Sequence, residues 1–306
     1  MEVLLSQVFF DNEGREGNPV LLALLNKEES KYFSDVLLTL QTLLQSIQDQ
    51  NTPPLEVLQQ LDLSDNILQT LFDHHVLTAC CAVIHIDAVQ HHNVVRAQCC
   101  NATHLIQCCG HGFFALSDVL FQRFPSLSSI DYASLATAYK KSHHHLPPVT
   151  VLSLPILAVE DISIPEFCNA ELTDAEILSA WQTENAQGYL LLEVNSNIDL
   201  ASLEVNVNCL EQYTLRACLI FQRKKTHGQW CITMRYFAPQ YGVREDLATA
   251  SVVRVLAFIL PVTKALEHVT IIQASEVGAS FSLQRQTTDV LIRGNSKVVY
   301  ANEIEK

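Results

Sequence analysis

The spacing of apolar and polar residues predicts strands followed by a buried helix in the first half of the chain. Residues 3–10 and 20–25 have the spacing of strands, and residues 33–48 repeat apolar side chains at helical spacing. Residues 113–121 are apolar on nearly every side. A helix with no polar face is typical of the inside of a domain, so we expect this helix to be central.

The second half of the chain repeats this order. Strands are predicted at 190–194, 215–221 and 229–237, and a turn follows at 238–250. A second, almost wholly apolar helix is then predicted at 251–260. The remaining strands are predicted at 269–274, 280–284, 290–293 and 297–300.

This repeated order indicates two domains of similar plan. The chain has 306 residues, which is comfortable for two domains of about 150 residues each. We expect an α+β protein with two pseudo-symmetric domains, each a curved, mostly antiparallel sheet around a central buried helix. The predicted domains are 1–124, with 295–306 returning to the first, and 125–294. If the two buried helices begin at one cleft, their N-termini would form an anion site there.

The composition and the charge limit the kinds of partner that we expect. Apolar residues make up 48% of the chain and charged residues 17%, which favours folded cores over disorder. The formal charge is −14 and only 19 residues are Lys or Arg, so we expect neither nucleic acid nor an anionic membrane as a partner. The one compact basic run, Arg223-Lys224-Lys225, is interpreted as a solvated turn.

The sequence predicts a cytoplasmic protein without a metal. Residues 252–263 are too short to span a bilayer and contain Arg254 and Pro261, and the N-terminus has Glu2 and no basic region of a signal peptide. Ten cysteines without an export signal are expected to be reduced thiols. Their adjacent pairs lack the spacing of zinc ligands, so we expect buried cysteines and no bound metal.

Four motifs, in the right order along most of the chain, resemble the PhzF-like (phenazine biosynthesis-like) isomerase family, which is related in fold to diaminopimelate epimerase. They are the opening segment 7–19 with Gly17-Asn18-Pro19, Cys109-Gly110-His111 before a helix, the long segment 235–251, and Gln273-Ala274-Ser275. The resemblance implies two diaminopimelate epimerase-like domains. It also implies an isomerase that moves a proton on a small carboxylate-bearing substrate without a metal or an organic cofactor.

The resemblance also assigns candidate site residues. Cys109 matches one epimerase thiol, and Thr249 stands where the second would be, which disfavours a two-cysteine racemase. His111, Asp246 and Ser251 match the histidine, aspartate and serine of PhzF-like members. Catalytic roles are expected for His111, Asp246 and Cys109. Substrate-binding roles are expected for Gly110, Gly112, Ser251, Thr249 and Asn18.

One family residue has no counterpart at the expected place. The glutamate that acts as the acid/base in PhzF-like members would fall within residues 77–82, which contain no carboxylate. Asp65 lies in a similar segment but much earlier in the chain. Ala250 replaces a glycine of the motif, and Glu276-Val277-Gly278 replaces a late substrate-binding segment.

Two functions therefore remain open. The first is a PhzF-like isomerase acting on a small amino or hydroxy acid, with His111, Asp246 and a nonstandard acid/base. The second is a catalytically inactive small-molecule-binding or interaction protein on the same fold. The missing carboxylate favours the second and the retained histidine, aspartate and serine favour the first. A homodimer is compatible with either.

Overall fold

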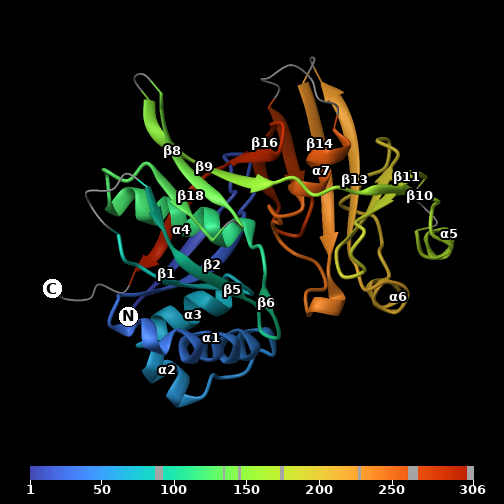
Figure 1. Cartoon of the computed structure of the whole chain (residues 1–306). Coiled ribbons are helices and arrows are strands. Elements are labelled where there is room, and N and C mark those ends of the chain that lie inside the picture. Colours follow the sequence, from blue (N-terminus) through green and yellow to red (C-terminus); the bar gives the residue numbers. More distant parts are fainter. Residues whose placement is uncertain are drawn as a thin grey trace. The chain divides into compact units, whose positions relative to one another are not determined.

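A computed structural model describes residues 1–86, 92–133, 135–143, 146–172, 176–226, 229–260 and 268–301. The chain forms two compact units (Figure 1). Unit 1 contains Met1–Val8, Asn18–Ser153 and Asn295–Lys306, and unit 2 contains Phe9–Gly17 and Leu154–Gly294. After its first strand the chain thus contributes residues 9–17 to unit 2. It enters unit 2 again at residue 154, whereas the sequence predicted a boundary near residue 124.

The main sheet of unit 1 has the strand order β18-β1-β2-β3-β5-β6. Its strands are β1 (Glu2–Val8), β2 (Asn18–Leu25), β3 (Ala79–Val83), β5 (Arg96–Cys100), β6 (Leu105–Ile106) and β18 (Ser296–Ala301). β2 and β3 run parallel, and the other pairs are antiparallel. The last described strand therefore lies beside the first, although the two are at opposite ends of the chain.

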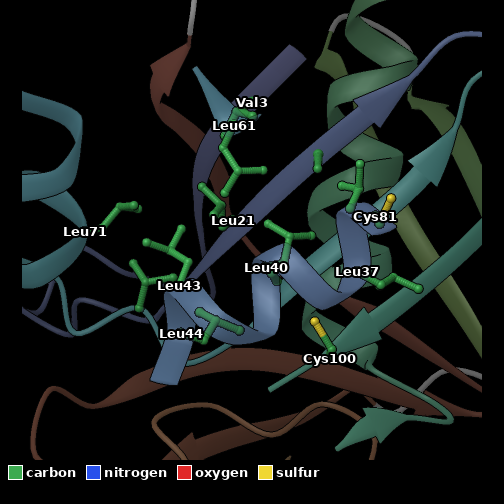
Figure 2. Packing of buried hydrophobic residues seen from close by; sticks show 14 of the residues in the cluster. Val3, Leu21, Leu37, Leu40, Leu43, Leu44, Leu61, Leu71, Cys81 and Cys100 are labelled. Atoms are coloured by element: carbon green, nitrogen blue, oxygen red, sulfur yellow. The ribbon is translucent and has the colours of Figure 1, made fainter. Parts of the chain in front are cut away.

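Helices α1 (Phe33–Gln48), α2 (Leu55–Leu61) and α3 (Asp65–Asp73) pack on one face of this sheet (Figure 1). Leu37 and Leu40 of α1 share an apolar core with Leu21, Cys81 and Cys100 of the strands (Figure 2). Successive side chains of a strand point to opposite faces, so Cys80 and Cys99 point away from this core. In β3 and in β5, two adjacent cysteines therefore point to opposite faces of the sheet.

The other face of the sheet is covered by α4 (Gly110–Arg123) (Figure 1). Every residue from Gly110 to Ser117 is buried, as the apolar pattern of 113–121 predicted. Four further strands of unit 1 follow the order β9-β8-β7-β4: β4 (His92–Val94), β7 (Ser129–Asp131), β8 (Thr137–His143) and β9 (Leu146–Pro155).

Unit 2 contains a mixed sheet with the strand order β10 to β17. Its strands are β10 (Glu160–Ile162), β11 (Ile177–Gln182), β12 (Tyr189–Val194), β13 (Ala217–Thr226), β14 (Gln229–Phe237), β15 (Val269–Gln273), β16 (Ala279–Arg285) and β17 (Asp289–Arg293). The pairs β12–β13 and β14–β15 are parallel and the others antiparallel. Its α-helices are α5 (Glu166–Glu171), α6 (Val207–Tyr213) and α7 (Val253–Ile259). The short 3-10 helices of the chain are η1 (Glu29–Tyr32) in unit 1 and η2 (Pro239–Tyr241) in unit 2.

The segment Phe9–Gly17 belongs to unit 2 because it packs against β16 and the turn before it. The ring of Phe9 lies 4.7 Å from that of Phe281, and the carbonyl of Phe9 accepts a hydrogen bond from the Ser280 amide at 2.7 Å. A Cβ at Gly294 would lie 2.5 Å from the Phe9 ring, so only glycine admits this contact. The amide of Gly17 also donates to the carbonyl of Gly278 at 2.9 Å.

The interpretation of Arg223-Lys224-Lys225 as a turn is wrong. All three residues lie within β13, which forms a long hairpin with β14. The Arg223 guanidinium makes two hydrogen bonds to the Glu193 carboxylate, at 2.7 and 2.6 Å. The run of basic residues suggested a solvated turn, but here these charged side chains lie along a strand. In the part of the chain that the structure describes, no helix has the length and apolar character needed to cross a bilayer.

We expect Leu40→Ala to lower the free energy of unfolding by about 2–5 kcal/mol, because Leu40 is fully buried between α1 and the sheet. Urea unfolding followed by circular dichroism measures this. The matched control is Leu38→Ala on the same helix, where the side chain is 66% exposed and the change should stay within about 0.5 kcal/mol. Equal losses in both variants would contradict the assigned buried face of α1.

Candidate functional site

The first group of candidate residues lies at the start of α4 in unit 1. Cys109 is the N-cap residue with an extended backbone, and its carbonyl accepts the first helical hydrogen bond, from the Phe113 amide, at 3.0 Å. The amides of the first turn have no partner within the helix and carry a partial positive charge. The residues Gly110, His111 and Gly112 form this turn.

Packing deeper in unit 1 fixes the position of this helix start. The ring of Phe113 stacks on Tyr132 with centroids 4.7 Å apart and an angle of 8° between the ring planes. The Tyr132 hydroxyl lies 2.7 Å from the Ser117 hydroxyl one turn further along the helix. A buried aromatic stack with its polar atom satisfied holds the first two turns of α4 in place.

Two cysteine sulfurs meet over the first turn of α4. A Cβ placed on Gly112 would lie 2.7 Å from Sγ of Cys99, on β5, and 3.1 Å from Sγ of Cys109. Both distances are shorter than ordinary contacts, so any side chain at residue 112 would displace a sulfur. Glycine at this position therefore allows the helix start and the β5 thiol to approach each other.

His111 completes the arrangement around Cys109. Sγ of Cys109 lies 3.6 Å from Nδ1 and 3.8 Å from Nε2 of the His111 ring, and both side chains are buried. A hydrogen bond from Cys99 lowers the pKa of the Cys109 thiol, against the effect of burial, which raises it. The charge of His111 and the Gly112 amide lower the pKa further. The geometry thus stabilises a thiolate on Cys109, because the charge forms beside a cation and a helix start.

The strand that would carry the family glutamate offers no replacement acid. Thr78 is buried just before β3, and Cys80 and Cys81 are fully buried within it, as expected for core residues. Burial raises the pKa of the Cys81 thiol, and its side chain belongs to the core under α1 (Figure 2). Cys80 points to the other face and lies directly across from Cys99 in the sheet.

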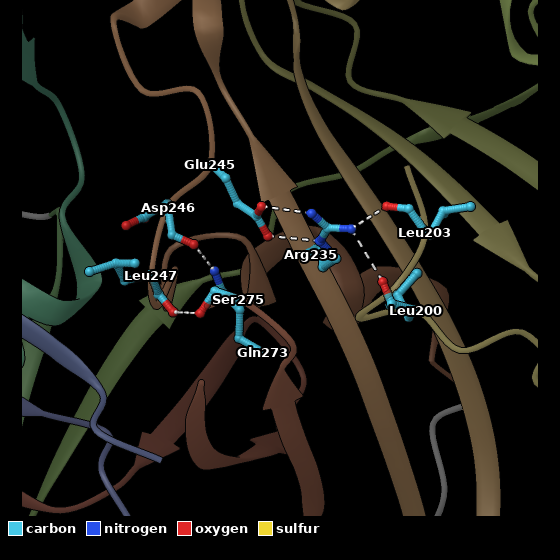
Figure 3. Close-up of polar contacts among 8 residues, drawn as sticks. All are labelled: Leu200, Leu203, Arg235, Glu245, Asp246, Leu247, Gln273 and Ser275. Carbon is cyan, nitrogen blue, oxygen red and sulfur yellow. Dashed lines mark hydrogen bonds and ion pairs between the residues drawn. The ribbon is translucent and has the colours of Figure 1, made fainter. Parts of the chain in front are cut away.

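The second group of candidate residues follows β14 in unit 2 (Figure 3). Arg235 binds the Glu245 carboxylate through Nε and Nη2, both at 2.8 Å, and donates from Nη1 to the carbonyl of Leu203 at 2.5 Å. It also donates to the carbonyl of Leu200 at 3.3 Å. A two-point bond between a guanidinium and a carboxylate fixes orientation as well as distance. Arg235 therefore holds the end of the turn that carries Asp246.

A buried glutamine holds Asp246 from the other side. Oε1 of Gln273 accepts a hydrogen bond from the Thr249 amide at 2.6 Å, and its Nε2 donates to the Asp246 carbonyl (Figure 3). The Thr249 hydroxyl donates to Oδ2 of Asp246 at 2.6 Å, and Ser275 Oγ donates to the Leu247 carbonyl at 2.7 Å. The Asp246 side chain is thus fixed by bonds to its backbone and to its carboxylate.

Ser251 and Asn18 are buried in different units. Ser251 lies in the turn before α7, and its carbonyl accepts a hydrogen bond from the Arg254 amide at 3.3 Å. The helix itself begins at Val253 with Val252 as its N-cap residue, so Ser251 does not cap it. Asn18 begins β2 in unit 1 and lies across from Val8 of β1.

The structure therefore brings the candidates together in two sets. Cys109, Gly110, His111 and Gly112 form one set in unit 1, and Asp246, Thr249 and Ser251 lie close along the chain in unit 2. The sequence analysis missed Cys99 because it appeared only as one member of a cysteine pair. It also missed Glu245 and the role of Gln273, although both stand inside the recognised motifs. Among the described residues, no cluster of three or more His, Cys, Asp or Glu side chains could hold a metal ion.

Comparisons with known proteins find a matching family model and similar solved structures. A family model described as phenazine biosynthesis-like protein matches residues 54–302. A structure of a phenazine biosynthesis PhzF-family protein from Enterococcus faecalis is 15% identical, with a TM-score of 0.64, and the match covers 100% of this chain and 99% of that one. A putative phenazine biosynthesis PhzC/PhzF protein from Clostridium difficile is also 15% identical, with a TM-score of 0.67 and full coverage of both chains.

A predicted epimerase from Pseudomonas aeruginosa is 14% identical, with a TM-score of 0.62, and covers 100% of this chain and 99% of that one. A search of the curated proteins finds no match. At these identities the solved structures show a shared fold. The fold is therefore α+β with two mixed sheets, as in PhzF-family structures.

We expect Gly112→Ala to disturb the thiols, because the new methyl group would overlap Sγ of Cys99. Overpacking of this kind lowers the free energy of unfolding by about 1–3 kcal/mol. Cys99→Ala removes the overlapping atom, so the double variant should lose less stability than the sum of the single changes. Chemical denaturation of the four proteins measures the coupling, and strict additivity would show that the two residues do not share this space.

We expect Gln273→Leu to destabilise unit 2 by about 1–3 kcal/mol, because the buried Thr249 amide and Asp246 carbonyl lose their partner. Thermal and urea unfolding measure the change. Gln286→Leu is the control, since that side chain is exposed and the substitution should shift stability by less than about 0.5 kcal/mol. A loss as small as the control's would mean that Gln273 does not hold the turn.

Proposed function

Because the chain belongs to the phenazine biosynthesis-like protein family, we propose that it is an isomerase that shifts a proton on a small carboxylate-bearing metabolite. The reaction would need no metal and no organic cofactor. The similarity to a predicted epimerase from Pseudomonas aeruginosa supports this reaction class. The substrate class that we favour is a small amino or hydroxy acid.

The observation that carries the proposal is the pairing of Cys109 with His111 at the start of α4. A proton shift needs a group that both takes and gives a proton near neutral pH. Thr78, Cys80 and Cys81 stand where the family glutamate is expected and offer no carboxylate. Cys109 is the described cysteine whose surroundings favour the thiolate, since its pKa is lowered while burial raises that of Cys81.

In this mechanism the Cys109 thiolate removes a proton from the carbon next to the substrate carboxylate. The negative charge that develops there would be stabilised by the amides of the first turn of α4. The resulting thiol, or His111, would return the proton at the new position. Asp246 would bind a substrate amine or orient His111, and Ser251 would donate a hydrogen bond to the carboxylate.

We propose that units 1 and 2 are pseudo-symmetric, diaminopimelate epimerase-like domains, and that Gly110, Gly112, Asn18, Thr249 and Ser251 bind the substrate. An experimental structure with a bound amino acid would test this arrangement. We further propose that the protein acts in the cytoplasm, where its ten cysteines stay reduced, and that a homodimer is its assembly.

A second candidate function is small-molecule binding without catalysis. The observation that favours it is the absence of a carboxylate from β3, where PhzF-like members are expected to carry their acid/base. The start of α4 would remain able to bind a carboxylate, because the positive end of a helix belongs to its backbone.

We expect solvent deuterium to enter the substrate carbon when a panel of amino and 2-hydroxy acids is incubated with the protein in heavy water. Cys109→Ser should lower the exchange rate by about 10²-fold or more, because a hydroxyl does not form the anion near neutral pH. Cys108→Ser is the matched control, since Cys108 is the neighbouring residue and is only partly buried. Mass spectrometry of the recovered acids measures the exchange.

Exchange that survives Cys109→Ser would contradict the assigned acid/base, and Asp65 would then be tested as the alternative carboxylate. Absence of exchange with every acid, together with binding of one of them by calorimetry, would support the binding protein instead. The rate should also fall as the pH is lowered through the pKa of Cys109, because protonation removes the base.

A further inference from the structure

We propose that Cys99 is a positioning residue whose thiol donates a hydrogen bond to the Cys109 sulfur and holds it over the first turn of α4, beside His111. The inference deepens the proposed function and rests on the role of Cys109 in proton transfer. Neither the family comparison nor the motifs assign a role to Cys99.

The sheet determines which cysteines can reach the helix start. Cys80 and Cys99 lie opposite each other on the antiparallel strands β3 and β5. Their neighbours Cys81 and Cys100 belong to the core under α1 (Figure 2). Because successive side chains of a strand point to opposite faces, Cys80 and Cys99 point to the face that α4 covers. All four side chains are fully buried. Only one cysteine of each adjacent pair therefore faces the candidate site.

The close approach at Gly112 brings Cys99 to Cys109. The Cβ position of that glycine is 2.7 Å from Sγ of Cys99 and 3.1 Å from Sγ of Cys109. The two sulfurs thus occupy the space beside one glycine, where the Cys99 thiol is placed to donate a hydrogen bond to Cys109. Rotation of the Cys109 side chain away from His111 would also separate the two sulfurs.

The surroundings decide which sulfur keeps the proton. Cys109 is next to the helix start and His111, whereas Cys99 lies in the sheet, where burial raises its pKa most and contacts with Cys109 and Cys80 raise it further. Cys100 and the buried Tyr132 hydroxyl are the other titratable groups close to these thiols, and burial raises the pKa of both. Cys99 is therefore the donor and Cys109 the acceptor of the hydrogen bond.

The test is a pH titration of thiolate absorbance in the ultraviolet, which needs no reagent to reach the buried sulfurs. Cys109→Ser assigns the signal, because the absorbance that this variant lacks belongs to Cys109. Cys99→Ala should then raise the midpoint for Cys109 by about 1–2 pH units, the size expected for a lost hydrogen bond to a charged group. Cys99→Ser, which keeps a donor, should restore part of the shift.

Cys81→Ala is the matched control, because it removes an equally buried thiol from the core under α1. It should leave the midpoint at the value of the unchanged protein. A midpoint that does not move in Cys99→Ala, or that moves equally in Cys81→Ala, would overturn the proposal. Circular dichroism of each variant ensures that the titrated proteins are folded.

The titration is independent of the proposed reaction. If no acid shows exchange but Cys99→Ala still moves the Cys109 midpoint, the thiol pair stands and the isomerase fails. If exchange depends on Cys109 but the midpoint does not respond to Cys99, the isomerase stands and the positioning role is refuted. Where both hold, Cys99→Ala should lower the exchange rate near neutral pH and recover it at higher pH.

Discussion

The close contact between the start of α4 and the β5 strand is the constraint on which the candidate site depends. Gly112 has no side chain, so the helix can approach the sheet until two sulfurs share the space over its first turn. The stack of Phe113 on Tyr132 and the Ser117–Tyr132 hydrogen bond hold the helix at that depth. A thiol, a histidine and the start of a helix then converge because the helix cannot move outward.

In unit 2 the candidate residues lie on a turn rather than at a helix start. The two-point ion pair of Arg235 with Glu245 and the buried Gln273 hold this turn in place. Asp246 is bound through its carbonyl by Gln273 and through its carboxylate by Thr249. The Thr249 hydroxyl thus orients the aspartate within the turn.

β3 carries adjacent thiols, one directed to each face of the sheet. Thiols pack as small apolar groups, so a fully apolar sheet interior tolerates them at little cost. A thiol becomes useful for proton transfer only where a cation and a helix start lie beside it, which distinguishes Cys109 from its buried neighbours.

The sequence by itself determined the family, the α+β class and many of the elements. Hydrophobic periodicity located α4 because a helix without a polar face must be buried, and it located β14 with the bounds that the structure has. It failed for β7 to β11, because β7 and β10 have only three residues each, and the basic residues of β8 and the two adjacent prolines of β9 interrupt the apolar pattern. The short helix α7 begins two residues later than its apolar pattern indicated.

Only the tertiary structure decided which candidate residues meet. Cys99 and Cys109 are ten positions apart, and their contact depends on the depth of a helix against a sheet, which no local pattern encodes. The bonds of Gln273 to Asp246 and Thr249 likewise join β15 to a turn that precedes it by more than twenty residues. The sequence specifies the type of each residue. The direction of a side chain and the pKa of a titratable group depend on what the fold packs around them.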